Sequence, residues 1–268
     1  MKQLSSRPPF ALVSALVSAL VSALVTAVLV AATASLSAAA AGQPEESVPA
    51  LTPAVQTAEW ASSWWLPRHE QKLADLAAGP QVDLLMLGDS ITHGWEQAGR
   101  DVWEEFYGDR RAFNLGFAGD RTEQVLWRLD HGEVDGIDPK LVVLMIGTNN
   151  SGHRQDPPAQ TASGIRAILD DLQRRLPSAR ILLLAIFPRG ADADDELRRL
   201  NDAVNQRIAA FADGERIHYL DLSSELLSPD GTLSEEVMPD LLHPNERGYR
   251  LWAEAMEPTI ERLLEDPG

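Results

Sequence analysis

Ser90 follows an apolar run in the segment LLMLGDSITHGW, residues 84–95. A short apolar run that ends at Gly-Asp-Ser indicates a buried strand followed by a polar loop. Serine is also favoured at the N-terminus of a helix, where its side chain caps a backbone N–H. Ser90 is therefore either a helix cap or a nucleophile, and a nucleophile needs a base that takes its proton.

Three further loops carry the groups that a nucleophilic serine needs. They are NLGFAGD at residues 114–120, GTNN at residues 147–150 and DLLHPN at residues 240–245. The first offers glycine-rich backbone around Gly119, and the second offers the side-chain amide of Asn149. The third places Asp240 three residues before His243, an acid–base pair. Acyl transfer by a serine enzyme requires a nucleophile, a base, a group that orients the base, and donors for the oxyanion.

Strand-like runs alternate with helical patterns along the chain. Strands are expected at residues 82–87, 111–115, 140–146, 179–187 and 216–222. Helices are expected within residues 60–78 and at 122–129, 159–176, 194–211 and 246–264. This alternation predicts βαβ units, and hence an α/β fold with a mainly parallel sheet and helices on both faces. Ligands bind at the carboxyl ends of the strands in such sheets. The loops with chemical groups are therefore expected to meet at one edge.

The N-terminal segment predicts export. Lys2 and Arg7 precede a long apolar stretch of repeated ALVS tetrads, which ends in small residues at 39–41. This pattern is typical of a signal peptide, although the stretch approaches the length of a membrane-spanning anchor. We expect a signal peptide or anchor at residues 1–42, a Pro-rich linker at 43–58 and a catalytic domain at 59–268. The protein would then be periplasmic or secreted, or membrane-anchored if the segment is retained.

The charge of the chain limits its partners. Without the first 42 residues there are 21 basic and 40 acidic residues, a net charge of −19. Such a surface repels phosphate backbones and anionic lipids, so nucleic acid is not an expected partner. The chain has no cysteine, which excludes disulfides and thiolate metal sites. Asp240 and His243 alone are too few ligands for a catalytic zinc, so no metal or other cofactor is expected.

The four loops, in this order, resemble the GDSL/SGNH hydrolase family. The segments FNLGFAGDRTEQVLWRL, VVLMIGTNN and LLHPNERGY are most similar to its branch containing the catalytic subunits of platelet-activating-factor acetylhydrolase. The resemblance implies a three-layer α/β/α sandwich with a mainly parallel, five-stranded, flavodoxin-like sheet. Two positions depart from the family pattern. Ile91 stands where the family name has Leu, and Asn150 stands where many members have Asp.

The resemblance also implies a role for each candidate residue. Ser90 would be the nucleophile, His243 the general base and Asp240 the group that orients it. The backbone N–H groups of Ser90 and Gly119 and the side-chain amide of Asn149 would form the oxyanion hole.

Several of these residues have simpler interpretations. Gly119 is also typical of a turn, and Asn149 of an Asx-turn. His93 lies nearer Ser90 in sequence than His243 does, but has no acid partner at a useful spacing. Among the tryptophans, Trp64 and Trp65 either stack against a sugar or, as we favour, pin the N-terminal segment against the domain. Trp95, one turn after Ser90, is a candidate for lining the substrate cleft.

The sequence therefore predicts an exported serine esterase that cleaves short-chain esters through an acyl-enzyme. The resemblance implies an acetyl group, and predicted export favours carbohydrate O-acetyl groups over lipids. The alternatives are a lysophospholipase or thioesterase, a lipid acetylhydrolase acting on platelet-activating-factor-type substrates, and a non-catalytic carbohydrate-binding surface protein. The expected partner is a small-molecule or carbohydrate ester, with no stable membrane partner unless the N-terminal segment is retained. No oligomeric state is specified.

Overall fold

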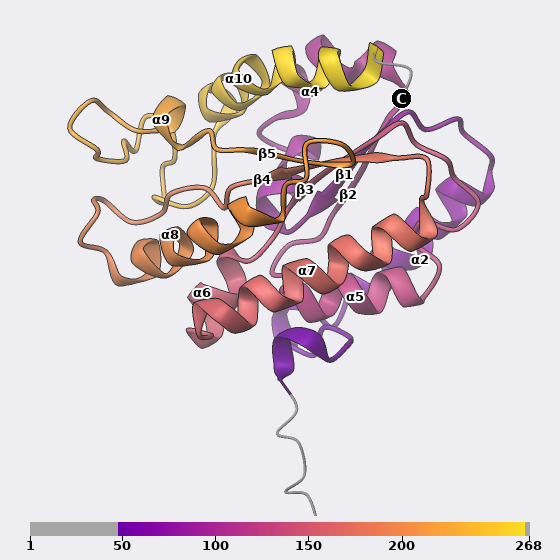
Figure 1. The fold of residues 1–268 in the computed structure, drawn as a ribbon, viewed down its shortest axis with the longest axis horizontal. Coiled ribbons are helices and arrows are strands. Elements are labelled where there is room, and N and C mark those ends of the chain that lie inside the picture. Colours follow the sequence, from indigo (N-terminus) through magenta and orange to yellow (C-terminus); the bar gives the residue numbers. More distant parts are fainter. Residues whose placement is uncertain (1–47, 266–268) are drawn as a thin grey trace, which may run out of the picture. The chain divides into compact units, whose positions relative to one another are not determined.

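A parallel sheet of five strands forms the centre of the computed structural model, which describes residues 48–265 (Figure 1). The strands are β1 (Leu84–Gly88), β2 (Ala112–Gly116), β3 (Leu141–Met145), β4 (Arg180–Leu184) and β5 (Ile217–Leu220). Their order is β2-β1-β3-β4-β5, and every neighbouring pair is parallel. This is the flavodoxin-like strand order. The predicted fold class and strand number are confirmed.

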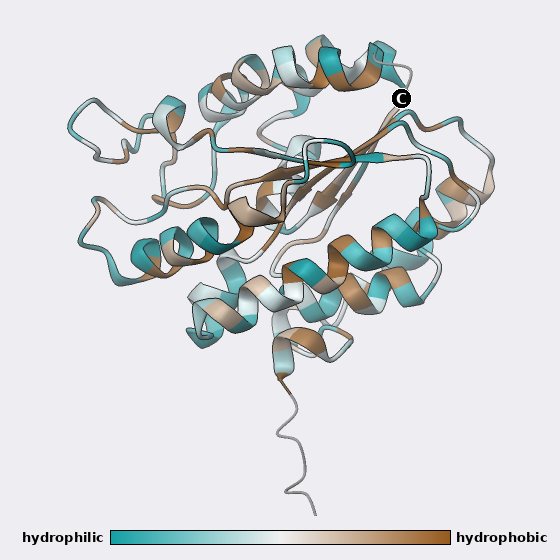
Figure 2. Cartoon of the chain, in the orientation of Figure 1, coloured by the Kyte–Doolittle hydropathy of each residue, from teal (hydrophilic) through white to brown (hydrophobic). Residues whose placement is uncertain are grey.

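Side chains of successive strand residues enter two separate cores, one on each face of the sheet. Leu85 and Leu87 of β1 belong to one core, whereas Leu84 and Met86 belong to the other. The alternation follows from the period of two in a β-strand. Because both faces are covered, β1 and β3 are buried along their whole length, which explains their continuous apolar runs. Figure 2 shows these strands as the most hydrophobic part of the domain.

Helices cover both faces of the sheet (Figure 1). One face packs against α2 (Trp65–Ala77), α5 (Thr122–Asp130), α7 (Pro158–Arg175) and α8 (Glu196–Ile208). The other packs against α3 (Ser90–His93), α4 (Arg100–Tyr107), α9 (Ser223–Leu226) and α10 (Glu246–Glu265). The short α6 (Thr148–Arg154) follows β3. None of the helices within residues 48–265 is long and apolar enough to span a membrane.

The predicted elements are present, with shifted boundaries. The predicted strands at 82–87 and 179–187 correspond to the shorter β1 and β4. Pairing of β1 begins only at Leu84 and continues to Gly88, whereas pairing of β4 ends at Leu184, before the apolar run does. The sequence patterns do not predict α4, α6 or α9. The eight residues of α4 include four charged ones, and only Val102 and Tyr107 of the helix are buried. An apolar pattern this sparse is a weak helix signal.

Residues 48–58, assigned to the linker from the sequence, pack against the domain. Thr122 Oγ1 donates to the carbonyl of Ala50 over 2.8 Å, and the N–H of Ala54 donates to the carbonyl of Glu123 over 3.1 Å. Gln56 is buried, and its side-chain amide donates to the carbonyl of Gly119 over 3.2 Å. The folded domain therefore extends to residue 48. The predicted signal peptide and residues 43–47 lie outside the described residues.

Candidate active site

The candidate residues lie at the carboxyl edge of the sheet, where the strand order reverses. Two neighbouring strands, β1 and β3, end in the loops that carry Ser90 and Asn149. The chain leaves β1 toward β2 on one side, whereas β3 lies on the other side. Crossovers depart in opposite directions at such a switch point, which leaves a crevice between the loops. The topology thus places Ser90 at the usual ligand-binding position of an open α/β sheet.

The helix cap at this position is Asp89 and not Ser90. The Asp89 carboxylate accepts a hydrogen bond from the N–H of Ile91 over 3.0 Å, at the N-terminus of α3. Ser90 is the first residue of the helix, and its hydroxyl bonds instead to the imidazole of His243, with 2.9 Å between Oγ and Nε2. The hydroxyl is therefore engaged with a base and plays no part in capping.

Ser90, His243 and Asp240 form one continuous chain of hydrogen bonds. His243 Nδ1 lies 2.6 Å from Asp240 Oδ2. The other carboxylate oxygen of Asp240 accepts from the backbone N–H groups of His243, over 2.7 Å, and Leu242, over 3.1 Å. These bonds fix the carboxylate relative to the ring, and the ring relative to Ser90. Partial burial alone would raise the pKa of Asp240, but the hydrogen bonds from His243 and the backbone lower it below its usual value.

The main chain before His243 is held by a bond to another loop. Leu241 has a φ of 56°, the left-handed region that non-glycine residues rarely adopt. Its carbonyl accepts from the N–H of Gly190, over 2.9 Å, in the loop that follows β4. Asp240 and His243 are thereby presented from one tight turn anchored to the sheet edge. This unfavourable conformation is consistent with the strain that proteins concentrate at functional sites.

Burial of Asp89 alters its ionisation. The carboxyl group is 1% exposed, and this burial raises its pKa to about 6, although the N–H of Ile91 and the charges of His243 and Arg189 lower it. The residue is thus a buried acid adjacent to the candidate nucleophile, and its charge in the folded protein depends on pH near neutrality.

Asn149 lies beside the turn formed by Gly119 and Asp120. The side-chain amide of Asn149 donates to the carbonyl of Asp120 over 2.9 Å, which uses one of its two N–H groups. Gly119 has a φ of 76°, and the backbone N–H groups of Ser90 and Gly119 donate to no other residue in the described part of the chain. Free backbone donors of this kind, next to an oriented amide, are the groups that an oxyanion hole needs.

A buried charge network supports the Gly119–Asp120 turn from behind. Arg128 is fully buried, and its guanidinium pairs with Asp120, over 2.9 Å, and with Glu133. The indole N–H of Trp65 donates to the same Asp120 carboxylate over 2.6 Å. Burial raises the pKa of Asp120 to about 7, and the nearby Arg128 lowers it only in part. Sequence patterns do not reveal this network, because its partners are distributed over separate elements.

The remaining histidines do not contact Ser90. His93 lies one turn after it, and burial, with nearby Arg68, lowers the pKa of the ring to about 4. His69 is buried beside Glu133, and His131 stacks on Trp127. The ring of His218 bonds to the carbonyl of Glu215. Only His243, of the histidines in the described chain, is bonded to the serine.

The tryptophans differ in their exposure to solvent, and Trp95 is not where the sequence predicts it. Trp95 is 1% exposed and packs in the core against Tyr249 and Trp252, so it does not line the cleft. Trp65 is buried, as expected of a residue that pins the N-terminal segment. Trp60, which the sequence analysis did not single out, is 52% exposed.

Arg189, in the loop after β4, was also missed. Its guanidinium donates to the carbonyl of Thr148 over 3.1 Å, beside Asn149, and its charge influences both Asp89 and Asp240. The position after a strand end was the available signal, because the loops at this edge form the crevice.

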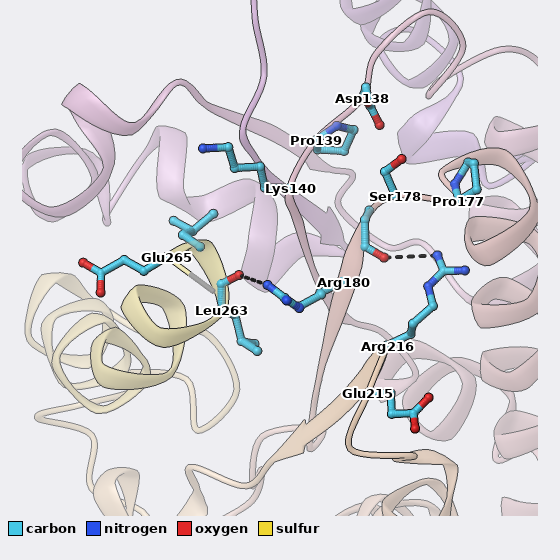
Figure 3. Close-up of a pocket in the computed structure, with 12 residues that line it drawn as sticks. Asp138, Pro139, Lys140, Pro177, Ser178, Arg180, Glu215, Arg216, Leu263 and Glu265 are labelled. Carbon is cyan, nitrogen blue, oxygen red and sulfur yellow. Dashed lines mark hydrogen bonds between the residues drawn. The ribbon is translucent and has the colours of Figure 1, made fainter. Parts of the chain in front are cut away.

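A hollow of about 690 Å³ lies at the other edge of the sheet (Figure 3). It is lined by residues that begin strands, among them Lys140, Arg180 and Arg216. Figure 3 shows Arg180 bonded to the carbonyl of Leu263. None of the candidate catalytic residues lines this hollow, so its size does not identify the reactive site. Within residues 48–265, no cluster of three acidic or histidine side chains is arranged to hold a metal.

Comparisons with known proteins identify the family of the chain. Residues 86–251 match the GDSL-like lipase/acylhydrolase family. The chain is 35% identical over 220 residues to human platelet-activating factor acetylhydrolase IB subunit alpha1, covering 82% of this chain and 92% of that protein. It is 36% identical over 201 residues to the bovine alpha1 subunit, covering 75% and 84% respectively.

Solved structures share the fold. A GDSL-like lipase from Bacteroides thetaiotaomicron has a TM-score of 0.60 at 19% identity, covering 72% of this chain and 97% of its own. An acetylxylan esterase from Geobacillus stearothermophilus has a TM-score of 0.53 at 18% identity, covering 70% and 96% respectively. The family match and the acetylhydrolase relatives, on a fold with this strand order, show that the chain belongs to the GDSL-like lipase/acylhydrolase family and is an ester hydrolase.

Proposed function

We propose that this protein is a serine esterase that hydrolyses short-chain carboxylic esters, above all acetyl esters, through a covalent acyl-enzyme. The observation that carries the proposal is the hydrogen-bonded chain from Ser90 Oγ through His243 to Asp240. A nucleophile bonded to a base, and a base oriented by a third group, is the arrangement that activates a serine. A non-catalytic binding protein would have no need for this chain of contacts.

The chemistry follows from the positions of the groups. Ser90 Oγ attacks the ester carbonyl carbon while His243 Nε2 accepts the hydroxyl proton, and Asp240 stabilises the resulting imidazolium. The carbonyl oxygen becomes an oxyanion that accepts from the N–H groups of Ser90 and Gly119 and the amide of Asn149. The bond to the alcohol then breaks, and His243 returns the proton to the departing oxygen. Water repeats the sequence, releasing the acid and regenerating the Ser90 hydroxyl.

We propose a carbohydrate as the alcohol that carries the acetyl group. The acetylxylan esterase from Geobacillus stearothermophilus shares the fold, and the net charge of the chain is −17, which disfavours approach to anionic lipid surfaces. The N-terminal pattern of Lys2, Arg7 and the ALVS repeats supports export, to the periplasm or the exterior, with anchoring if the segment is retained. An exported esterase would meet acetylated polysaccharides there.

The test is hydrolysis of p-nitrophenyl acetate, butyrate and octanoate by the purified protein and by a Ser90→Ala variant. We expect the acetate to be cleaved with the highest kcat/KM, and the variant to be inactive while retaining its circular dichroism spectrum. Preference for octanoate would instead indicate a lysophospholipase or thioesterase. Equal, feeble activity of both proteins would contradict a serine mechanism.

A second candidate function is lipid acetylhydrolysis. It is favoured by the 35% identity to the human platelet-activating factor acetylhydrolase subunit. An acetylated ether phospholipid distinguishes the two candidates, because a carbohydrate esterase should cleave an acetylated pyranoside with a higher kcat/KM than this lipid. The reverse order would assign the protein to lipids.

A further inference from the structure

Two tryptophans outside the part of the chain that matches the family lie next to the candidate oxyanion hole. Trp60 is 52% exposed, and Trp64 is half-buried. Their rings are 6.1 Å apart at 30°, and the indole N–H of Trp64 donates to the carbonyl of Trp60 over 3.0 Å. We call this pair the aromatic platform. Adjacent aromatic rings that leave apolar surface exposed beside reactive groups form a candidate ligand-binding surface.

The Trp60 ring of the platform packs directly against the backbone of Gly119. A Cβ added to Gly119 would lie 2.0 Å from the outer edge of the Trp60 ring, so the ring occupies the space that any other residue would fill. Gln56, on the same N-terminal segment, donates to the carbonyl of Gly119. The lack of a side chain at Gly119 therefore allows the ring to approach the backbone from which the candidate oxyanion donor projects.

The platform also spans the two helices that begin at the reactive groups. The Trp64 ring lies 6.0 Å from that of His93, the last residue of α3, which begins at Ser90. The Trp60 ring lies 6.5 Å from that of His153 in α6, which begins next to Asn149. A ligand on the platform would consequently border the position of the ester that Ser90 attacks.

Anchoring the N-terminal segment does not require the Trp60 ring, although Trp64 packs partly against the anchoring cluster of Ala61, Trp65 and Phe117. Trp65 already does so, because it is 1% exposed, bonds to Asp120 and packs against Phe117 and Trp127. A residue whose only role is anchoring would be buried in the same way, whereas Trp60 leaves half of its surface to solvent.

We propose that the aromatic platform binds the sugar ring of an O-acetylated pyranoside and presents its acetyl group to Ser90. The inference rests on the proposed esterase function and assigns the residues that bind the alcohol side of its substrate. An indole face offers an apolar surface to the C–H face of a sugar. The indole N–H of Trp60 can donate to a sugar hydroxyl, whereas that of Trp64 already donates to the carbonyl of Trp60.

A quaternary ammonium headgroup fits this position less well. Such cations are bound by aromatic rings arranged around them as a cage, whereas the two rings here lie 30° from parallel. Two guanidinium groups lie near the His153 ring, which borders the platform. Arg121 Nη1 is 3.5 Å from His153 Nδ1, and burial together with the charges of Arg121 and Arg189 lowers the pKa of this ring. Pairing with Glu123 reduces the repulsion that Arg121 exerts on a cation, whereas a neutral sugar is unaffected by either guanidinium charge.

The experiment compares two acetate esters of similar size. Peracetylated methyl xylopyranoside carries its acetyl groups on a ring, and triacetin carries the same number on an acyclic chain. We expect Trp60→Ala to lower the ratio of kcat/KM for the pyranoside to that for triacetin by about tenfold, mainly through KM. Trp60→Tyr should restore most of the ratio, because a flat ring is retained. Leu66→Ala, which removes another exposed apolar side chain of the same segment, should leave the ratio unchanged.

The outcomes separate this inference from the esterase itself. Loss of both activities in equal proportion, or an unchanged ratio in Trp60→Ala, would overturn the platform while leaving the esterase intact.

If the wild type cleaved neither ester, binding would still test the platform. Ser90→Ala should then show saturable quenching of tryptophan fluorescence by the pyranoside, and Ser90→Ala/Trp60→Ala should not. A selective loss on an acetylated choline phospholipid instead would assign the platform to a headgroup and overturn the sugar proposal.

Discussion

His243 Nε2 lies 2.9 Å from Ser90 Oγ, although 153 residues separate them in the sequence. The contact joins the segment after β1 to the turn before α10, and these two segments are far apart in the sequence. The hydroxyl of Ser90 is therefore paired with a base before any substrate binds.

Removal of this hydroxyl should abolish hydrolysis. We expect Ser90→Ala to lower kcat by at least about a thousandfold, because the acyl-enzyme cannot form without the nucleophile. Stability should change little, since Asp89 and not Ser90 caps α3. Initial rates on p-nitrophenyl acetate and urea unfolding of both proteins check this. A variant that kept a tenth of the activity would rule out Ser90 as nucleophile.

Asp240 orients a ring that must change its charge during the reaction. We expect Asp240→Asn to lower kcat by about 10²–10⁴, because an amide neither stabilises the imidazolium nor selects the correct tautomer. The lowered pKa of Asp240 keeps its carboxylate ionised in mildly acidic solution, so this group should not limit the wild-type activity there. Measurement of kcat as a function of pH for the wild type and for Asp240→Asn tests both expectations. A wild-type-like kcat in Asp240→Asn would contradict the role.

The amide of Asn149 should act on the transition state more than on the substrate. We expect Asn149→Ala to lower kcat by about 10²–10³ and to change KM little, as for the loss of one oxyanion donor. Steady-state kinetics on p-nitrophenyl acetate would show this. A change confined to KM would place the amide in ground-state binding instead.

Asp89 should make stability depend on pH. Its pKa rises from 3.8 in the unfolded chain to about 6 in the fold, so between these values the folded protein binds more protons. Stability from this group therefore increases as pH falls from above 6 to below 4. Asp89→Asn should be more stable than wild type at pH 8, by on the order of 3 kcal/mol at most, with a difference that shrinks toward pH 4. Urea unfolding across this pH range checks the sign, and a difference that grew on acidification would refute it.

Gly119 and Trp60 should be energetically coupled. Gly119→Ala places a Cβ against the Trp60 ring and strains a backbone with a φ of 76°, so we expect it to lower both activity and stability. In the double variant, Trp60→Ala should relieve the clash with the new Cβ but not the backbone strain at position 119. The free energy of unfolding of the double variant should therefore exceed the additive value. Strict additivity would show that the ring moves aside without cost.

Much of the fold was predictable from local patterns. Continuous apolar runs at residues 84–88 and 141–145 indicate strands buried on both faces. In α7, the apolar positions Ile165, Ile168, Leu169 and Leu172 repeat at helical spacing, and all are buried. The candidate catalytic residues could be named because each follows a strand end or forms a short acid–histidine pair. The missed elements α4 and α9 are short and have few buried residues, so their sequences carry little periodic signal.

By itself, the sequence determined the kind of chemistry and the class of fold, because these depend on residue type and on short-range spacing. Only the tertiary structure decided which group caps α3, which tryptophans are exposed, and which charged groups are buried together. These are long-range relations. The Asp120–Arg128 pair is dry because several elements enclose it, and the Trp60 ring reaches Gly119 because the N-terminal segment folds back over the sheet edge. No local pattern encodes such contacts, since they arise when the chain packs.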